Sequence, residues 1–237
     1  MPFTHYLIYL LLLAGVILSI WRQKLTVRGA ITGGIIGLLI FKGDGYTGIA
    51  MLTLFFVAGT GATGWQINRK QQAGMAERDK GKRTAGQVIA NGGIAALLGG
   101  LVWYSPQYSV MLQLMMAGSL AAATADTLSS ELGTLYGKRF YDIISFKKAA
   151  AGPDGVVSLE GTLIGAAGAA LIAFIYLLGG FTIAGLIIVV AGVTGNLADS
   201  ILGATLERRG IIGNNTVNFL NTLTGALVGA VLWLAIT

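Results

Sequence analysis

Apolar runs long enough to cross a bilayer dominate this chain, with polar residues confined to short stretches between them. A helix needs about 20 mostly apolar residues to span the hydrocarbon core. This criterion predicts eight helices, the second short and the fifth and seventh long: Phe3–Trp21, Val27–Phe41, Tyr46–Ile67, Gln87–Tyr104, Val110–Tyr136, Leu159–Leu178, Phe181–Leu206 and Val217–Ile236. The pattern predicts an all-α, polytopic transmembrane bundle of about eight spans, in one membrane domain over residues 1–237.

The basic residues sort by side when eight spans alternate in direction. Of the 16 Lys and Arg residues, all except Lys42 fall in the connections on one side. The positive-inside rule assigns that side to the cytoplasm and both termini to the outside. The longer connections (68–86, 137–158 and 207–216) lie on this side too, so we expect the protein to act at its cytoplasmic face. No basic segment precedes the first run and no small-residue cleavage site follows it, so we expect an uncleaved anchor.

Composition narrows the function classes further. Hydrophobic residues make up 54% and charged residues 11% of the chain, against about 25% charged in soluble domains, which excludes a soluble globular enzyme. The 36 glycines suit helices that pack closely in lipid. The chain has no Cys and its one His is His5, so thiolate zinc sites and His-based triads are excluded. The net charge of +6 follows from topology, and no nucleic-acid partner is expected.

An internal duplication is one interpretation of the fourth and eighth predicted spans. A shift of 130 residues places Asn91, Gly99 and Trp103 on Asn221, Gly229 and Trp233. Parallel four-span halves, about 1–105 and 106–237, would explain the match. The alternative is that Gly- and Ala-rich helices resemble one another by composition alone.

Three carboxylates lie inside predicted spans, where an ionisable group costs about 2.5–3.5 kcal/mol at the helix centre and usually faces a functional interior. Asp126 and Glu131 lie toward the cytoplasmic end of the fifth span and Asp199 toward that of the seventh. Residues five apart are about 140° apart on an ideal helix, so Asp126 and Glu131 share a face only if the helix is distorted. A structural ion pair is the alternative role for each of the three.

Amides and cations accompany these carboxylates at the same predicted depth. One helical stripe carries Arg83, Gln87 and Asn91, and the start of the eighth span carries Asn214 and Asn218. A turn-rich loop supplies a third group: Lys147, Lys148, Asp154 and Gly155. Interhelical hydrogen bonding is the alternative role for Asn91 and Asn221, and a solvated topogenic patch is the alternative for Lys80, Lys82 and Arg83.

Together these groups predict a site of carboxylate oxygens, which suits a hard metal ion, beside a second site of basic and amide groups. Mg²⁺ binds through one or two carboxylates and shares its coordination with substrate phosphates. Guanidinium, ammonium and amide groups bind the remaining phosphate oxygens. Gly81-Lys82 is not part of a P-loop, because the rest of that motif is absent.

Five short blocks, in order over about residues 25–237, resemble signatures of the phytyl-phosphate kinase family, which includes transmembrane-protein-nineteen-like proteins. They are Gly81-Lys82-Arg83 with Gln87 to Gly93, Asp126-Thr127 with Ser130 to Gly133, Pro153 to Ser158 with Gly161-Thr162, Asp199-Ser200 with Leu202 to Ala204, and Asn214 with Val217-Asn218. The chain departs from the family pattern at Asp154, where Asn or Thr is expected, and at Leu128, where many members carry Trp.

The resemblance implies a kinase of the bacterial or archaeal plasma membrane that converts a prenyl monophosphate, such as phytyl phosphate, to its diphosphate, with CTP as the expected donor. Asp126, Glu131 and Asp199 would be the catalytic carboxylates and hold Mg²⁺. The phosphates would contact Arg83, Gln87, Asn91, Lys147, Lys148, Asp154, Gly155, Ser200, Asn214 and Asn218. A transporter or flippase, and a cytidylyltransferase that makes a CDP-lipid, are the alternatives, and the oligomeric state is left open.

Overall fold

The computed structural model describes residues 3–72, 82–180 and 184–236. Its α-helices are α1 (Phe3–Trp21), α2 (Val27–Gly64), α3 (Ile67–Gln72), α4 (Ala85–Tyr104), α5 (Ser109–Tyr136), α6 (Leu159–Leu178), α7 (Gly185–Leu202) and α8 (Asn214–Ile236). A 3₁₀ turn (Pro106–Tyr108) precedes α5, and a π-helical turn (Gly203–Glu207) continues α7. Strands β1 (Phe140–Asp142) and β2 (Val156–Ser158) pair antiparallel, with Phe140 opposite Ser158. The predicted all-α class is confirmed.

Within the described residues, six helices are long and apolar enough to cross a membrane, and α1 adds a shorter apolar helix over Tyr6–Trp21. One of the six, α2, contains two predicted spans. Its backbone leaves helical geometry at Gly45, with φ 57° and ψ −137°, a conformation that favours glycine. Gly29 and Gly59, on either side of Gly45, both pack against Arg83, so the two halves of α2 run antiparallel. The sequence prediction of separate helices before and after Lys42–Gly45 therefore agrees with the structure.

The helix α5 lies at the centre of the bundle and contacts α2, α4, α6, α7 and α8. Its middle turns are built from small residues, and Ala117, Ala121 and Ala125 have no exposed surface. A Cβ on Gly118 would lie 2.6 Å from the carbonyl oxygen of Gly225 on α8. Small residues at helix contacts allow the backbones to approach this closely in a bilayer.

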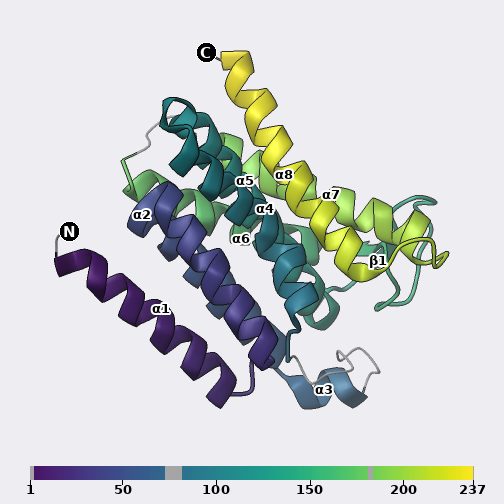
Figure 1. The fold of residues 1–237 in the computed structure, drawn as a ribbon. Coiled ribbons are helices and arrows are strands. Elements are labelled where there is room, and N and C mark those ends of the chain that lie inside the picture. The colour runs from purple at the N-terminus through teal and green to yellow at the C-terminus, as the bar shows by residue number, and fades with distance from the viewer. Residues whose placement is uncertain (1–2, 73–81, 181–183, 237) are drawn as a thin grey trace.

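The connections gather at two ends of the bundle. Figure 1 shows the chain ends at the left and the top, α3 at the bottom and β1 at the right. Backbone hydrogen bonds join Arg83 to Lys24 and Thr26 at the α3 end. Lys42 lies at the other end, over the rings of Tyr9 and Trp103.

The described residues therefore keep the predicted separation of charge. Arg78 and Lys80, and the predicted start of the seventh span at Phe181, lie outside the described residues. The sequence did not predict α3 or the β1–β2 pair. Both are short and lie in segments that were predicted to be loops.

We predict that Gly118→Ala destabilises the protein by about 1–3 kcal/mol, the usual cost of overpacking a filled core. The added methyl group would press on the backbone of α8, which cannot move without shifting a whole helix. Thermal unfolding in detergent measures the effect. Gly64→Ala is the matched control, because nothing lies within 4 Å of a Cβ at Gly64, and equal melting temperatures for the two variants would contradict the prediction.

Candidate functional site

A polar cavity of about 220 Å³ opens among the ends of α4, α5, α6, α7 and α8 on the α3 side of the bundle. Its volume suits a few small polar groups instead of a whole drug-sized ligand. Most residues singled out from the sequence line it: Arg83, Gln87, Asn91, Asp126, Glu131, Asp154, Gly155, Asp199, Ser200, Asn214 and Asn218. Segments far apart in the chain thus meet at one site.

Two of the three predicted carboxylates face each other. The carboxyl groups of Asp126 on α5 and Asp199 on α7 lie within hydrogen-bonding range of each other. Oδ1 of Asp199 is buried without a hydrogen-bond partner. Two carboxylates at this separation repel unless they share a proton or a cation. The pair is therefore suited to hold a divalent cation.

Glu131 has a different environment. Its Oε2 lies 2.5 Å from Nζ of Lys70, a residue of α3 that is only 1% exposed. Nζ of Lys70 also donates to the carbonyl oxygen of Ala62, at 2.7 Å. The side chain of Glu131 thus compensates a buried ammonium group and joins α3 to α5. This is the structural ion pair that was the alternative role for Glu131.

The structure does not assemble the predicted set of three metal ligands. Nowhere in the described ranges do three His, Cys, Asp or Glu side chains lie close enough to hold one metal ion. The reason is the helical geometry, since Asp126 and Glu131 point about 140° apart along α5. The carboxyl groups of Asp126 and Asp199 remain, and one or two carboxylates are what Mg²⁺ uses when phosphates and water complete its coordination.

A further carboxylate that sequence reasoning did not select reaches the cavity. Glu207 ends the π-helical turn after α7 and lines the cavity. It interacts electrostatically with Asp126 and Asp199, and its carboxyl group lies near the side chain of Asn214. On an ideal α-helix it would lie about 80° from Asp199, so its position depends on the π-turn. Such turns often occur at functional sites.

Amide and guanidinium groups line the opposite wall. Arg83 lies over the ring of Phe55 at 5.5 Å and attracts Asp126 electrostatically. Gln87 completes a capping box at the start of α4, where its Oε1 accepts from the backbone N–H of Thr84 at 2.8 Å. Asn91 donates from Nδ2 to the carbonyl oxygen of Gln87 at 3.0 Å, while its Oδ1 is buried without a partner. This wall thus presents the guanidinium of Arg83 and the unpartnered Oδ1 of Asn91 to the cavity.

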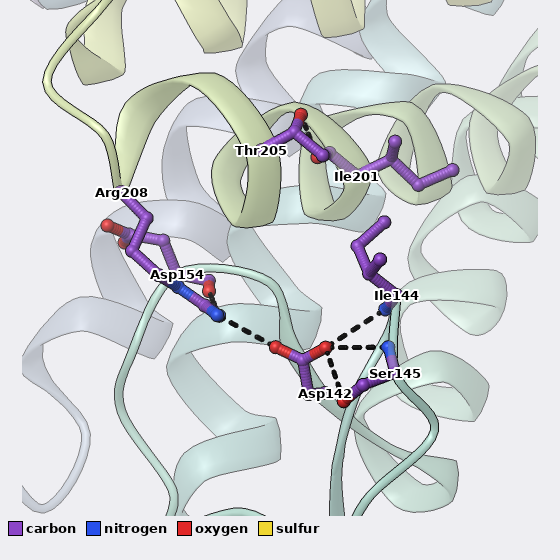
Figure 2. A network of polar contacts seen from close by, with 7 residues as sticks. All are labelled: Asp142, Ile144, Ser145, Asp154, Ile201, Thr205 and Arg208. Atoms are coloured by element: carbon purple, nitrogen blue, oxygen red, sulfur yellow. Dashed lines mark hydrogen bonds and ion pairs between the residues drawn. The ribbon is translucent and has the colours of Figure 1, made fainter.

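A loop between β1 and β2 covers one side of the cavity, and Arg208 holds it in place (Figure 2). Nη1 of Arg208 lies 2.8 Å from Oδ2 of Asp142, and Nη2 donates to the carbonyl oxygen of Asp154. Oδ1 of Asp142 accepts from the N–H groups of Ile144 and Ser145 at 3.1 and 2.8 Å. The network ties the β1 turn to the end of the π-helical turn.

Gly155 brings the same loop against that turn. Its φ of 73° is in the left-handed region, and a Cβ there would collide with Ala204. Lys147 and Lys148 were predicted to bind phosphate in this cavity, but their positions differ from that prediction. They are exposed and do not line the cavity, and the carbonyl oxygen of Lys147 accepts from the N–H of Asp142. Their backbone closes the turn, which directs their side chains away from the cavity.

Hydrogen bonding between helices, the alternative role for Asn91 and Asn221, is not seen among the described residues. Asn91 bonds within its own helix, and both side-chain polar atoms of the fully buried Asn221 have no hydrogen-bond partner. The hydroxyl of Thr222 forms the bond between α8 and α4 instead, to the carbonyl oxygen of Ala90 at 3.2 Å.

The Lys70–Glu131 pair generates a stability prediction. Removing one partner of a buried ion pair costs about 3–5 kcal/mol, because the other charge is left uncompensated. Lys70→Met and Glu131→Gln should each lower the melting temperature, and the double variant should recover part of the loss. A double variant whose loss equals the sum of the two single losses would show that the pair is not coupled.

Asp142 generates a prediction about pH. The backbone N–H of Ser145 and the guanidinium of Arg208 hold the pKa of this carboxyl below its ordinary value of 3.8. The ionised group therefore stabilises the loop at all pH values above 3.8, and this contribution is lost as pH falls further, through the folded-state pKa. Asp142→Asn should speed amide hydrogen exchange over residues 140–158 at neutral pH, and the difference from wild type should shrink only below pH 3.8. A difference that already disappears between pH 7 and 5 would contradict this assignment.

Comparison with known proteins identifies relatives across nearly the whole chain. A membrane protein of Methanocaldococcus jannaschii, described as uncharacterized, is 34% identical over 207 residues, covering 87% of this chain and 84% of its own. The chloroplastic protein VTE6 of Arabidopsis thaliana is 31% identical over 212 residues, covering 86% of this chain and 64% of its own. An uncharacterized membrane protein of Synechocystis is 32% identical over 212 residues, covering 87% of this chain and 82% of its own. No protein of solved structure matches the chain at a significant level.

The family comparison agrees with the fold and with these relatives. Residues 10–226 match the family described as integral membrane protein DUF92, a range that includes every residue of the polar cavity. The chain is an integral membrane protein and belongs to the DUF92 family.

Proposed function

We propose that this protein is a membrane kinase that transfers the terminal phosphoryl group of a nucleoside triphosphate, with CTP as the expected donor, to a prenyl monophosphate. The observation that carries the proposal is the polar cavity at one end of an apolar bundle, where the facing carboxyl groups of Asp126 and Asp199 lie across from Arg83. A lipid phosphate and a soluble nucleotide can meet only at such a membrane boundary.

Phosphoryl transfer requires mainly positioning and charge neutralisation. In the proposed reaction an oxygen of the prenyl monophosphate forms a bond to the γ-phosphorus of the donor. The bond from that phosphorus to the bridging oxygen breaks, and the nucleoside diphosphate leaves with the electron pair. The acceptor is already an anion at neutral pH, so no strong general base is needed, which suits a chain whose one His is His5.

Asp126 and Asp199 would hold Mg²⁺, since their carboxyl groups face each other and Oδ1 of Asp199 has no hydrogen-bond partner. Mg²⁺ supplies charge neutralisation to phosphate oxygens when bound. Arg83 would bind a phosphate of either substrate, because a guanidinium matches two phosphate oxygens at once. Asn214 and Asn218, which hydrogen-bond to each other at 3.3 Å, would orient further oxygens. Glu131 has a structural role in this scheme, through Lys70.

Two further observations support the proposal. The five blocks that resemble phytyl-phosphate kinases contribute residues to one cavity, although the first and last blocks lie more than 100 residues apart in the chain. The plant protein VTE6 also shares 31% identity with the chain. We place the cavity on the cytoplasmic side, because the basic connections lie at the same end of the bundle.

We predict that Asp126→Asn and Asp199→Asn each reduce phosphoryl transfer by about 10²–10³-fold, the scale seen when one group that stabilises transition-state charge is lost. The assay uses purified protein in detergent with Mg²⁺, CTP or ATP labelled at the γ-position, and phytyl or geranylgeranyl monophosphate. Asp44→Asn serves as a matched control, since it removes a buried carboxylate that does not line the cavity.

The position of the labelled phosphate in the nucleotide distinguishes a kinase from a cytidylyltransferase. Label from the γ-position in a lipid diphosphate supports the kinase, and comparison of donors gives the nucleotide preference. Label from the α-position in the lipid would instead show a cytidylyltransferase. Carboxylate variants that fold and keep full activity would contradict the assignment of Asp126 and Asp199.

A further inference from the structure

A second cavity lies beside the polar one and has the opposite chemistry. It is an apolar groove of about 630 Å³ between α1, α2 and α4, a volume typical of ligand sites, which span about 300–1,000 Å³. Leucine, isoleucine, valine and phenylalanine side chains form most of its wall, with Gly15, Gly33 and Gly34. It follows α1 from Ile8 to Ser19, about 17 Å at the helical rise. The groove is long enough for an extended chain.

Charge is concentrated at one end of this groove. Among the described residues, its lining includes Arg22, Lys24 and Arg83 and no carboxylate. The backbone of Arg83 hydrogen-bonds to Lys24 and Thr26, which holds the start of α4 beside the connection between α1 and α2. Arg22 also lies over the ring of Trp21, at 5.0 Å. An occupant with an anionic head and an apolar tail matches this distribution.

Three residues line both the groove and the polar cavity: Arg83, Gln87 and Asn91. They form the wall between the two cavities, on the first turns of α4 and the residue before its cap. Asn91 is 8% exposed, and its Oδ1 has no hydrogen-bond partner. A buried acceptor without a partner is costly, and it would be satisfied by a donor that enters from either cavity, such as the hydroxyl of a protonated phosphate.

We infer that the groove between α1, α2 and α4 is the binding site for the isoprenoid chain of the acceptor, and that its phosphate lies at the wall formed by Arg83, Gln87 and Asn91. This inference rests on the proposed function for the identity of the ligand. The tail lies along α1, and the head group reaches the polar cavity on the side of Asp126 and Asp199. The groove thereby determines which chain lengths the enzyme accepts.

A single glycine allows a direct test. A Cβ at Gly33 would meet only the side chains of Leu25 and Val88, at 3.8 and 3.9 Å, so a larger residue there fills the groove without colliding with the backbone. Gly33→Leu should raise the KM for a twenty-carbon monophosphate at least tenfold more than the KM for a five-carbon one. One extra or missing methylene group in an apolar pocket already changes the discrimination between two substrates by about 10–200-fold.

The matched control is Gly61→Leu, on the second half of α2. Gly61 is exposed, lines neither cavity and has nothing within 4 Å of a Cβ. This variant should keep the wild-type ratio of the two KM values. Equal ratios in Gly33→Leu, Gly61→Leu and wild type would overturn the inference while leaving the kinase proposal intact.

Photo-crosslinking separates failure of the groove from failure of the kinase. A prenyl monophosphate with a diazirine at its tail should label peptides of α1, α2 or α4 and be displaced by unlabelled prenyl monophosphate. Such labelling without phosphoryl transfer by the wild-type protein would support the groove and contradict the kinase. Labelling displaced equally well by a bilayer phospholipid would show that the groove holds ordinary lipid, which overturns the inference.

Discussion

The close packing of α5 against five other helices is the contact on which the rest of the structure depends. In lipid, helices gain little from hiding apolar side chains, so association depends on how closely their backbones approach. The middle turns of α5 meet this requirement with Ala and Gly, and Gly118 touches the backbone of α8 at Gly225. The same helix carries Asp126 and Glu131, about two and three and a half turns after Gly118. The best-packed element of the bundle therefore positions the carboxylates of the candidate site.

The buried polar groups near the polar cavity are of two kinds, those with partners and those without. Lys70 and Glu131 compensate each other's charge, and Lys70 also donates to the carbonyl oxygen of Ala62. Asp199 and Asn91 each retain an unpartnered buried oxygen beside the polar cavity. Because unpartnered buried polar atoms are rare in folded proteins, the second group indicates a binding site and the first a structural clamp.

The two cavities together suit an amphipathic substrate. One is lined by carboxylates and amides, the other by apolar side chains, and they meet at the first turns of α4. A transporter would need polar groups that continue toward the far side of the membrane. Here the polar cavity is confined to one end, while the groove that continues from it is apolar. This arrangement favours chemistry on a lipid head group at the membrane boundary.

The sequence by itself determined the class, the helices and the side on which charge accumulates. Apolar runs and basic residues are local features, and a bilayer requires each span to satisfy its own backbone hydrogen bonds, so α1 and α6 begin and end where the pattern predicts. It also identified Asp126 and Asp199, because a carboxylate in an apolar run stands out. The proposed four-span repeat stays a prediction.

Which carboxylates face each other was decided by the tertiary structure alone. The partner of Glu131 is a lysine 61 residues away on α3, a helix too short and polar to be predicted. Glu207 reaches the cavity through a π-helical turn, and the β1–β2 turn directs Lys147 and Lys148 elsewhere. These pairings depend on helix rotation and backbone irregularities that no spacing in the chain records, because they arise only when separate elements pack together.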